Sequence, residues 1–155
     1  MPTLELRPFA LPEAERVASW AATPEDVRAL MGTDDFPLTA DQIAAWTYEA
    51  DYAFTLRRAG ELTTYAEVVE DVVEQDVEIQ RLLVAPDQRG TGAGRAMLLR
   101  LCAFLAEAWP YPEVWLRVGR DNLAAAACAR AAGFEGIDAM SGPRYLWLKK
   151  ALRSQ

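Results

Sequence analysis

The sequence predicts an α/β (α+β) fold with a single mixed, mostly antiparallel twisted sheet of about six or seven strands flanked by helices. Three observations lead to this prediction. Short apolar or alternating segments bounded by turn residues are typical of strands. Amphipathic segments that begin with capping residues are typical of helices. Between residues 79 and 118, a strand, a glycine-rich loop, a long apolar helix and another strand follow one another, which is the order of a parallel crossover.

The first 50 residues predict one strand followed by three helices. The strand is expected at 4–7 and the helices at 12–21, 24–31 and 39–49. Thr23 before Pro24 supplies an N-cap and a proline at the first helical position. Thr39 and Gln42 have the spacing of a capping box.

The rest of the chain predicts six further strands and two further helices. The strands are expected at 52–57, 62–73, about 77–84, 114–118, from about 134, and 144–149, and the helices at 92–109 and 122–132. Ala59-Gly60 is the expected turn of a hairpin. The acidic residues after this turn are expected either to solvate a hairpin or to attract a cationic substrate; they are Glu67, Glu70, Asp71, Glu74 and Asp76.

Length and composition indicate one globular domain, residues 1–155, because 52% of the residues are hydrophobic and 25% are charged. Neither a membrane-spanning apolar run nor a signal peptide is recognisable, so we expect a cytoplasmic protein without a membrane partner. Cys102 and Cys128 are then expected to be buried, reduced thiols. The formal net charge of −7 argues against a nucleic-acid partner and favours a cationic acceptor.

The absence of histidine narrows the chemistry. It excludes Ser-His-Asp and Cys-His nucleophilic sites and zinc motifs built on histidine. Two cysteines are too few for a four-ligand structural zinc site, so no metal is expected. Carboxylates, tyrosines, thiols and backbone amides are left to carry a reaction.

The loop before the 92–109 helix has the features of a phosphate site. Gly90, Gly92 and Gly94 permit backbone angles that other residues resist, and they leave no side chain over the amides. The helix that follows directs its free N–H groups and the positive end of its dipole at the same place. A phosphate group is therefore the expected ligand.

Spacing decides which phosphate motif this is. A P-loop requires Lys-Ser/Thr after its last glycine, where Arg95-Ala96 stands. The dinucleotide fingerprint fails as well, because its third glycine position falls on Arg95 or on Met97. The pattern present is Arg-x-x-Gly-x-Gly, starting at Arg89 behind Val84-Ala85-Pro86, and it resembles the acetyl-CoA site of the GNAT N-acetyltransferase superfamily.

A second motif supports this resemblance. Asn122-x-x-Ala125 follows the 114–118 strand and precedes Gly133-Phe134, in the order and at the separations that the superfamily shows. The resemblance covers roughly residues 50 to 149 and is poor before residue 50.

The resemblance implies acetyl-CoA as the co-substrate and a set of residues that bind it. These are Leu83, Val84, Arg89, Gly90, Thr91, Gly92, Ala93, Gly94, Arg95 and Asn122. It places the diphosphate on the amides of 89–95, with both arginines adding charge, and places the thioester oxygen or the pantetheine chain at the Val84 amide. The alternatives are that the arginines are merely solvated, and that Asn122 or Asp121 merely caps the next helix.

The resemblance also implies that Glu78 draws the proton from the amine, usually through water. Strand alternation is expected to place Glu78, Gln80, Leu82 and Val84 on one face. The alternative is that Glu78 is one more solvated acid of the acidic segment.

The sequence departs from the superfamily at Ala129, where many relatives carry a tyrosine that protonates the leaving thiolate. Alanine cannot donate a proton. Tyr145, Cys128 or a water is left for this role, and Tyr145 is the candidate that we carry forward.

These features together predict an acyl-CoA-dependent N-acetyltransferase in which a primary amine attacks the thioester directly. The acceptor is either a small amine or a protein N-terminus or lysine. Ala129 motivates the alternative, a non-catalytic acyl-CoA-binding or regulatory module with the same fold. A short edge strand would support a homodimer.

Overall fold

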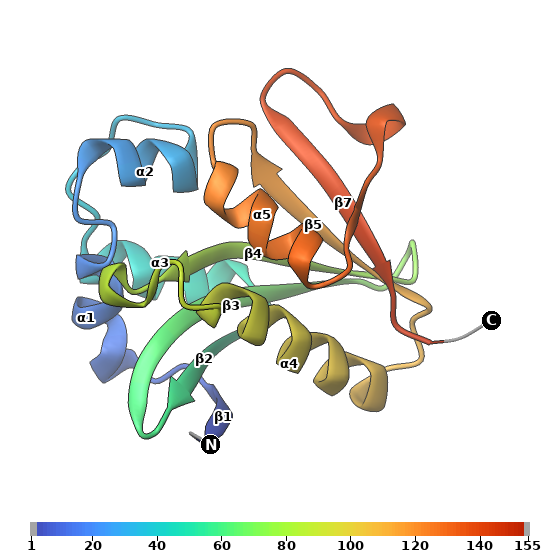
Figure 1. Cartoon of the computed structure of the whole chain (residues 1–155), viewed down its shortest axis with the longest axis horizontal. Coiled ribbons are helices and arrows are strands. Elements are labelled where there is room, and N and C mark those ends of the chain that lie inside the picture. The colour runs from blue at the N-terminus through green and yellow to red at the C-terminus, as the bar shows by residue number, and fades with distance from the viewer. Residues whose placement is uncertain (1–2, 154–155) are drawn as a thin grey trace.

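The computed structural model describes residues 3–153, which form one seven-stranded sheet with helices packed on both faces (Figure 1). The strand order is β1-β2-β3-β4-β5-β7-β6. Within the described residues every neighbouring pair is antiparallel except β4 and β5, which are parallel and joined by α4. The predicted fold class is therefore confirmed, including the parallel crossover after the glycine-rich loop.

The strands are β1 (Leu4–Pro8), β2 (Tyr52–Arg58), β3 (Glu61–Asp71), β4 (Asp76–Val84), β5 (Glu113–Gly119), β6 (Glu135–Gly136) and β7 (Tyr145–Ala151). The α-helices are α1 (Ala14–Ser19), α2 (Pro24–Met31), α3 (Ala40–Glu49), α4 (Ala93–Ala108) and α5 (Leu123–Ala131). Short 3-10 helices lie at Leu11–Glu13, Pro86–Gln88 and Asp138–Met140. None of the helices within residues 3–153 combines the length and the apolar character that a membrane crossing requires.

The predicted helix starts are confirmed in detail. Thr23 Oγ1 accepts a hydrogen bond from the Asp26 amide at 3.1 Å, and Thr39 and Gln42 form the expected capping box. The single helix expected at 12–21 is wrong, because the segment splits into a 3-10 turn and the six-residue α1. The chain leaves the helix at Trp20, whose buried side chain joins the core, before Thr23 starts α2. The strand expected from 134 is reduced to the two residues of β6.

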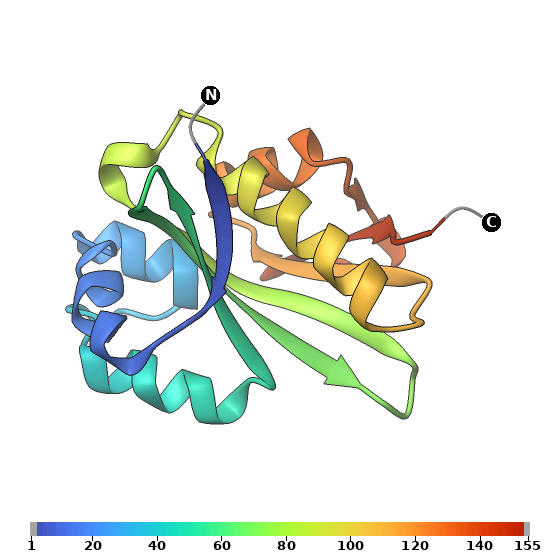
Figure 2. The same ribbon diagram turned by 90° about the horizontal axis from the view of Figure 1, so that it is seen from below.

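Two hydrophobic cores lie on the two faces of the sheet (Figure 2). Helices α4 and α5 cover one face, where Met97, Leu98 and Leu101 are fully buried. Helices α1, α2 and α3 cover the other face, where Val17 and Ile43 are fully buried. Their apolar residues recur at helical spacing, which is why the sequence pattern located these elements.

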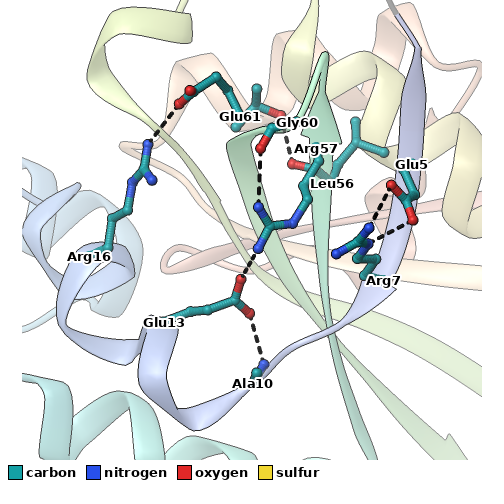
Figure 3. Close-up of polar contacts among 10 residues, drawn as sticks. Glu5, Arg7, Ala10, Glu13, Arg16, Leu56, Arg57, Gly60 and Glu61 are labelled. Atoms are coloured by element: carbon teal, nitrogen blue, oxygen red, sulfur yellow. Dashed lines mark hydrogen bonds and ion pairs between the residues drawn. The ribbon is translucent and has the colours of Figure 1, made fainter.

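Ion pairs join the N-terminal helices to the β2–β3 hairpin (Figure 3). Arg57 Nη2 donates to Glu13 Oε2 at 2.6 Å, and the same guanidinium donates to the Gly60 carbonyl at 3.1 Å. Arg16 pairs with Glu61 at 3.2 Å on the exposed surface. The Arg57–Glu13 pair is the more sheltered of the two, so we expect it to contribute more to holding α1 against the sheet.

A β-bulge interrupts β4 at Arg81, whose φ is 53°. Tyr65 pairs with Leu83 across the β3–β4 ladder, whereas Glu67 pairs with Gln80, so one extra residue stands on β4. The prediction that Glu78, Gln80, Leu82 and Val84 share a face is therefore wrong. Leu82 lies in the core under α4, on the same face as Ile79, because the inserted residue reverses the alternation beyond it.

Strands β4 and β5 separate soon after they meet. They pair from Val77 to Ile79 of β4 with Val114 to Leu116 of β5, and the described residues show no pairing beyond that point. The Ala85 amide donates to the Thr63 carbonyl of β3 at 2.9 Å. Since N–H directions alternate along a strand, the Val84 amide points to the opposite edge, where β5 has diverged.

Glu67 is not part of a solvated acidic segment, which corrects the interpretation from sequence. Its side chain is fully buried and accepts hydrogen bonds from Tyr65 Oη at 2.5 Å, Gln80 Nε2 at 2.9 Å and Arg81 Nη1 at 3.0 Å. Arg81 also pairs with Glu49 at 3.0 Å. Burial raises the pKa of Glu67, and the Tyr65, Arg81 and Gln80 contacts partly oppose this. The network therefore fastens both bulge residues, 80 and 81, to β3.

Removal of the Glu67 carboxylate tests this network. We expect Glu67→Ala to lower the free energy of unfolding by about 2–4 kcal/mol, because the buried Tyr65 hydroxyl and Arg81 lose their common acceptor. Urea unfolding measures the change, and the exposed Glu74→Ala is the matched control, expected within about 0.5 kcal/mol of wild type. Equal midpoints for the two variants would show that the network adds no stability.

The same residue predicts a pH dependence. Burial raises the pKa of Glu67, so folding favours the protonated carboxyl group. The stability that this protonated group contributes is fully present below the pKa of a glutamate in the unfolded chain. It is lost as the pH rises through the raised pKa of Glu67 in the folded protein. Glu67→Gln cannot ionise. Its stability relative to wild type is therefore expected to improve as pH rises from acid to neutral, and a constant difference in unfolding free energy over that range would contradict this.

Candidate active site

A cavity of about 530 Å³ opens where β4 leaves β5. Its walls come from residues within 82–84 of β4, 88–95 of the loop and α4, 121–131 around α5, and 26–30 of α2. These elements converge around the end of β4 (Figure 1). The cavity therefore joins the glycine-rich loop, the start of α4 and the unpaired edge of β4 in one continuous space.

The three glycines of the loop serve two different purposes. Gly90 and Gly92 have φ values of 77° and 87°, a left-handed backbone that favours glycine, and a Cβ at either would meet nothing within 4 Å. Gly94 lies in the first turn of α4, where a Cβ would stand 2.6 Å from Cys128 Sγ. Two glycines therefore shape the loop, and the third lets α4 approach α5 closely.

Both loop arginines are engaged with the protein while they line the cavity. Arg89 donates to the Trp20 carbonyl at 2.9 Å and to Asp26 Oδ1 at 3.2 Å. Arg95 Nε donates to the Ala131 carbonyl at 3.1 Å. Neither is simply solvated: Arg89 ties the loop to the N-terminal helices, and Arg95 ties the start of α4 to the end of α5.

Most of the binding residues expected from the resemblance do line this cavity. They are Leu83, Val84, Arg89, Gly90, Gly92, Ala93, Gly94, Arg95 and Asn122. Thr91 is not among the lining residues, and its hydroxyl donates to the Gln88 carbonyl. Asn122 Oδ1 accepts from the Ala125 amide at 3.1 Å, so Asn122 does cap α5, and the same residue also lines the cavity.

A second cavity of about 170 Å³ lies at the β4 bulge. Its lining residues are Leu30, Met31, Gln80, Arg81, Arg117, Gly119 and Tyr145. Leu30 also lines the larger cavity, and Gln80 and Arg81 directly precede the β4 residues of that cavity, so the two cavities are neighbours along β4 and α2. Tyr145 belongs to the smaller cavity, whereas Cys128 belongs to the larger one.

Glu78 lies on β4 two residues before Gln80, and it is not among the lining residues of either cavity. Its side chain is 26% exposed, and its buried Oε1 has no hydrogen-bond partner within residues 3–153. Arg117 Nε is 3.9 Å away, too far for a hydrogen bond. Burial raises the pKa of Glu78, and the charge of Arg117 partly opposes this. A half-buried carboxylate of this kind suits proton transfer better than solvation of a surface.

Ala129, where many relatives carry a tyrosine, is a fully buried residue of α5 and belongs to the core. The neighbouring residue, Cys128, lines the larger cavity. Both cysteines are free thiols, but Cys128 is only partly buried, unlike Cys102. Burial raises the pKa of the Cys128 thiol, and a hydrogen bond from the Arg95 backbone opposes this. In residues 3–153, no three potential metal-ligating side chains lie together.

The sequence motifs did not predict that Arg81 and Arg117 line a cavity together with Gln80. Their spacing in the sequence carries no motif, and the bulge that brings Gln80 and Arg81 to the cavity is not visible in it. Arg117 falls on an ordinary alternating position of β5. The sequence did contain one indication, the charge of Arg117. An arginine in the middle of an otherwise apolar strand is uncommon and suggests a specific role.

Comparison with known proteins gives a consistent result. The family model described as Acetyltransferase (GNAT) family matches residues 15–134. Uncharacterised N-acetyltransferases of Mycobacterium tuberculosis and Mycobacterium bovis are 28% identical to the chain over 116 residues, which is 74% of the chain and 71% of each relative.

Solved structures show the same fold at low sequence identity. A spermidine N-acetyltransferase from Vibrio cholerae in complex with CoA and spermine is 15% identical, with a TM-score of 0.75 over 96% of this chain and 95% of the other. The aminoglycoside acetyltransferase AAC(6')-Ib in complex with coenzyme A is 16% identical, with a TM-score of 0.78 over 96% and 95%.

The contact between α4 and α5 at the cavity yields a test by double-mutant cycle. Gly94→Ala is expected to lower the free energy of unfolding by about 1–3 kcal/mol, because the new Cβ would overlap Cys128 Sγ. In a Cys128→Ala background the same substitution should cost much less, since the sulfur is gone. Urea unfolding of the four proteins measures the coupling, and a coupling energy near zero would contradict this explanation of Gly94.

Proposed function

Because the chain belongs to the GNAT family of acetyltransferases, we propose that it moves an acetyl group from acetyl-CoA to a primary amine by direct attack on the thioester. The observation that supports this most is the continuous cavity from the α4 N-terminus to the open edge of β4. Residues 1–155 act in this proposal as one acetyltransferase domain, since both cores share the one sheet.

The donor would be held by the loop and by β4. The left-handed Gly90 and Gly92 leave the amides of 89–95 bare beside the positive end of α4, which suits a diphosphate. The Val84 amide, directed into the opening between β4 and β5, would donate to the thioester oxygen. Such a donor stabilises the developing oxyanion by several kcal/mol, of order 3 in measured cases. Structural neighbours solved with CoA support this choice of donor.

The acceptor would enter through the smaller cavity, which is the neighbour of the larger, donor-binding cavity along β4 and α2. Glu78 would take one proton from the amine, through a water beside Gln80. The amine nitrogen then forms a bond to the carbonyl carbon, and the carbon–sulfur bond breaks. Tyr145 would return a proton to the leaving thiolate, so that CoA leaves as a thiol. Structural neighbours that bind spermine or act on aminoglycosides support an amine as acceptor.

A direct assay tests the proposal. Release of the CoA thiol is followed with acetyl-CoA and a panel of polyamines, amino acids, aminoglycosides and lysine peptides, while calorimetry measures acetyl-CoA binding. We expect binding and turnover with at least one amine. Binding without turnover would favour the non-catalytic module that Ala129 suggests, and absence of binding would overturn both functions.

Glu78→Gln tests the proton acceptor. We expect kcat/KM to fall by about 10²-fold or more, because the amide cannot take a proton. In the wild type, the acid limb of the pH profile should lie above the ordinary pKa of a glutamate, since burial raises the pKa of Glu78. That limb should vanish in Glu78→Gln. The exposed Glu107→Gln is the matched control, and equal rates for the two variants would remove Glu78 from the mechanism.

Tyr145→Phe and Cys128→Ser identify the group that protonates the thiolate. We expect Tyr145→Phe to lower kcat by at least about tenfold with every acceptor, because the leaving thiolate is always that of CoA and proton donation contributes about 10²–10⁴-fold. Cys128→Ser should leave the pH profile of kcat unchanged. The reverse pattern would assign the role to Cys128, which lines the donor cavity itself.

A further inference from the structure

The smaller cavity contains two arginines, which is unexpected for a site that receives a cation. Arg81 and Arg117 both line it, together with Gln80 and Tyr145. The charge balance of each arginine decides what kind of group the cavity can hold.

Arg81 is already compensated within the protein. Its guanidinium is shared between Glu67 and Glu49, each at 3.0 Å, and it lies over the Trp46 ring at 4.6 Å from the ring centroid. Arg81 therefore has little capacity left for a ligand anion.

Arg117 is not compensated in this way. Its nearest ion-pair partner is Glu78, at 3.9 Å from Nε, and within residues 3–153 its guanidinium donates no hydrogen bond. Its guanidinium carbon lies 4.8 Å from the centroid of Tyr145 and 5.9 Å from that of Trp147. Stacking on two rings fixes the plane of the group and leaves its edges free, and its side chain is 41% exposed.

A guanidinium held in this way matches a carboxylate, which it binds through two parallel hydrogen bonds. Because Glu78 and Arg117 lie side by side, an amine directed at Glu78 and an anion bound by Arg117 must be separated by few bonds. From this geometry we propose that the acceptor is a small amine that also carries a carboxylate, as in an α-amino acid, and that Arg117 binds that carboxylate. The inference rests on the proposed acetyl transfer and names its substrate class.

The net charge of −7 does not argue against an anionic group at this place. Charges on exposed side chains are largely screened beyond about 8 Å at physiological salt. A direct charge-assisted contact is stronger than that distant background. The local arginine therefore decides the preference, and the small cavity volume of about 170 Å³ restricts the acceptor to a compact molecule.

Matched acceptor pairs test the inference. The kcat/KM for CoA release is measured for a set of L-α-amino acids and for the carboxamide of each, which keeps the amine and side chain but removes the anion. We expect the acids to be preferred by at least about tenfold, equivalent to about 1.4 kcal/mol. Arg117→Gln should reduce this ratio to near one, mainly through KM, whereas Arg100→Gln, an exposed arginine on α4, should retain the wild-type ratio.

The outcomes separate the inference from the proposed function. If polyamines, aminoglycosides or carboxamides are acetylated as well as the acids or better, acetyl transfer stands and the carboxylate preference is overturned. If no amine is acetylated, calorimetry with an N-acetyl-L-amino acid in the presence of CoA still decides the inference. Binding that is weakened at least about tenfold by Arg117→Gln would support it, and absence of binding to the wild type would overturn it.

Discussion

The bulge at Arg81 is the constraint on which the rest of the structure depends. Without the extra residue, β4 would continue its alternation, and Leu82 and Leu83 would each face the core that the other one now occupies. A left-handed arginine in a strand is an unfavourable conformation, and Glu67 offsets this cost by binding Gln80 and Arg81 from β3. One buried carboxylate thus holds the bulge residues against β3.

The centre of the molecule holds two neighbouring cavities with different chemistry. The larger cavity is lined in part by bare backbone and small residues, among them Gly90, Gly92 and the alanines of α5, so it suits a long, flexible ligand held through its diphosphate. The second cavity is smaller and polar, with Gln80, Arg117 and Tyr145 in its wall. In the proposed reaction, this division would let the donor and the acceptor bind without sharing binding groups.

Local electrostatics, and not the charge of the whole chain, decides which charged group the smaller cavity can bind. Glu67 and Glu49 neutralise Arg81, whereas Arg117 keeps its donors and lies beside Glu78. The charge of Arg117 favours the ionised form of Glu78. Burial of Glu78 has the larger effect, so the pKa of Glu78 is raised. The same pair would therefore receive a proton and orient the molecule that supplies it.

The sequence by itself determined the fold class, the crossover around the glycine-rich loop, the helix caps at Thr23 and Thr39, and the family, because periodicity, capping and motif spacing are local properties. It did not determine that Glu67 is buried or that Gly94 faces Cys128, nor did it reveal the bulge that separates Leu82 from Glu78. Those features depend on partners 13 to 34 residues distant, such as Gln80 for Glu67. Contacts at such separations are set by how strands and helices pack, so only the tertiary structure decided them.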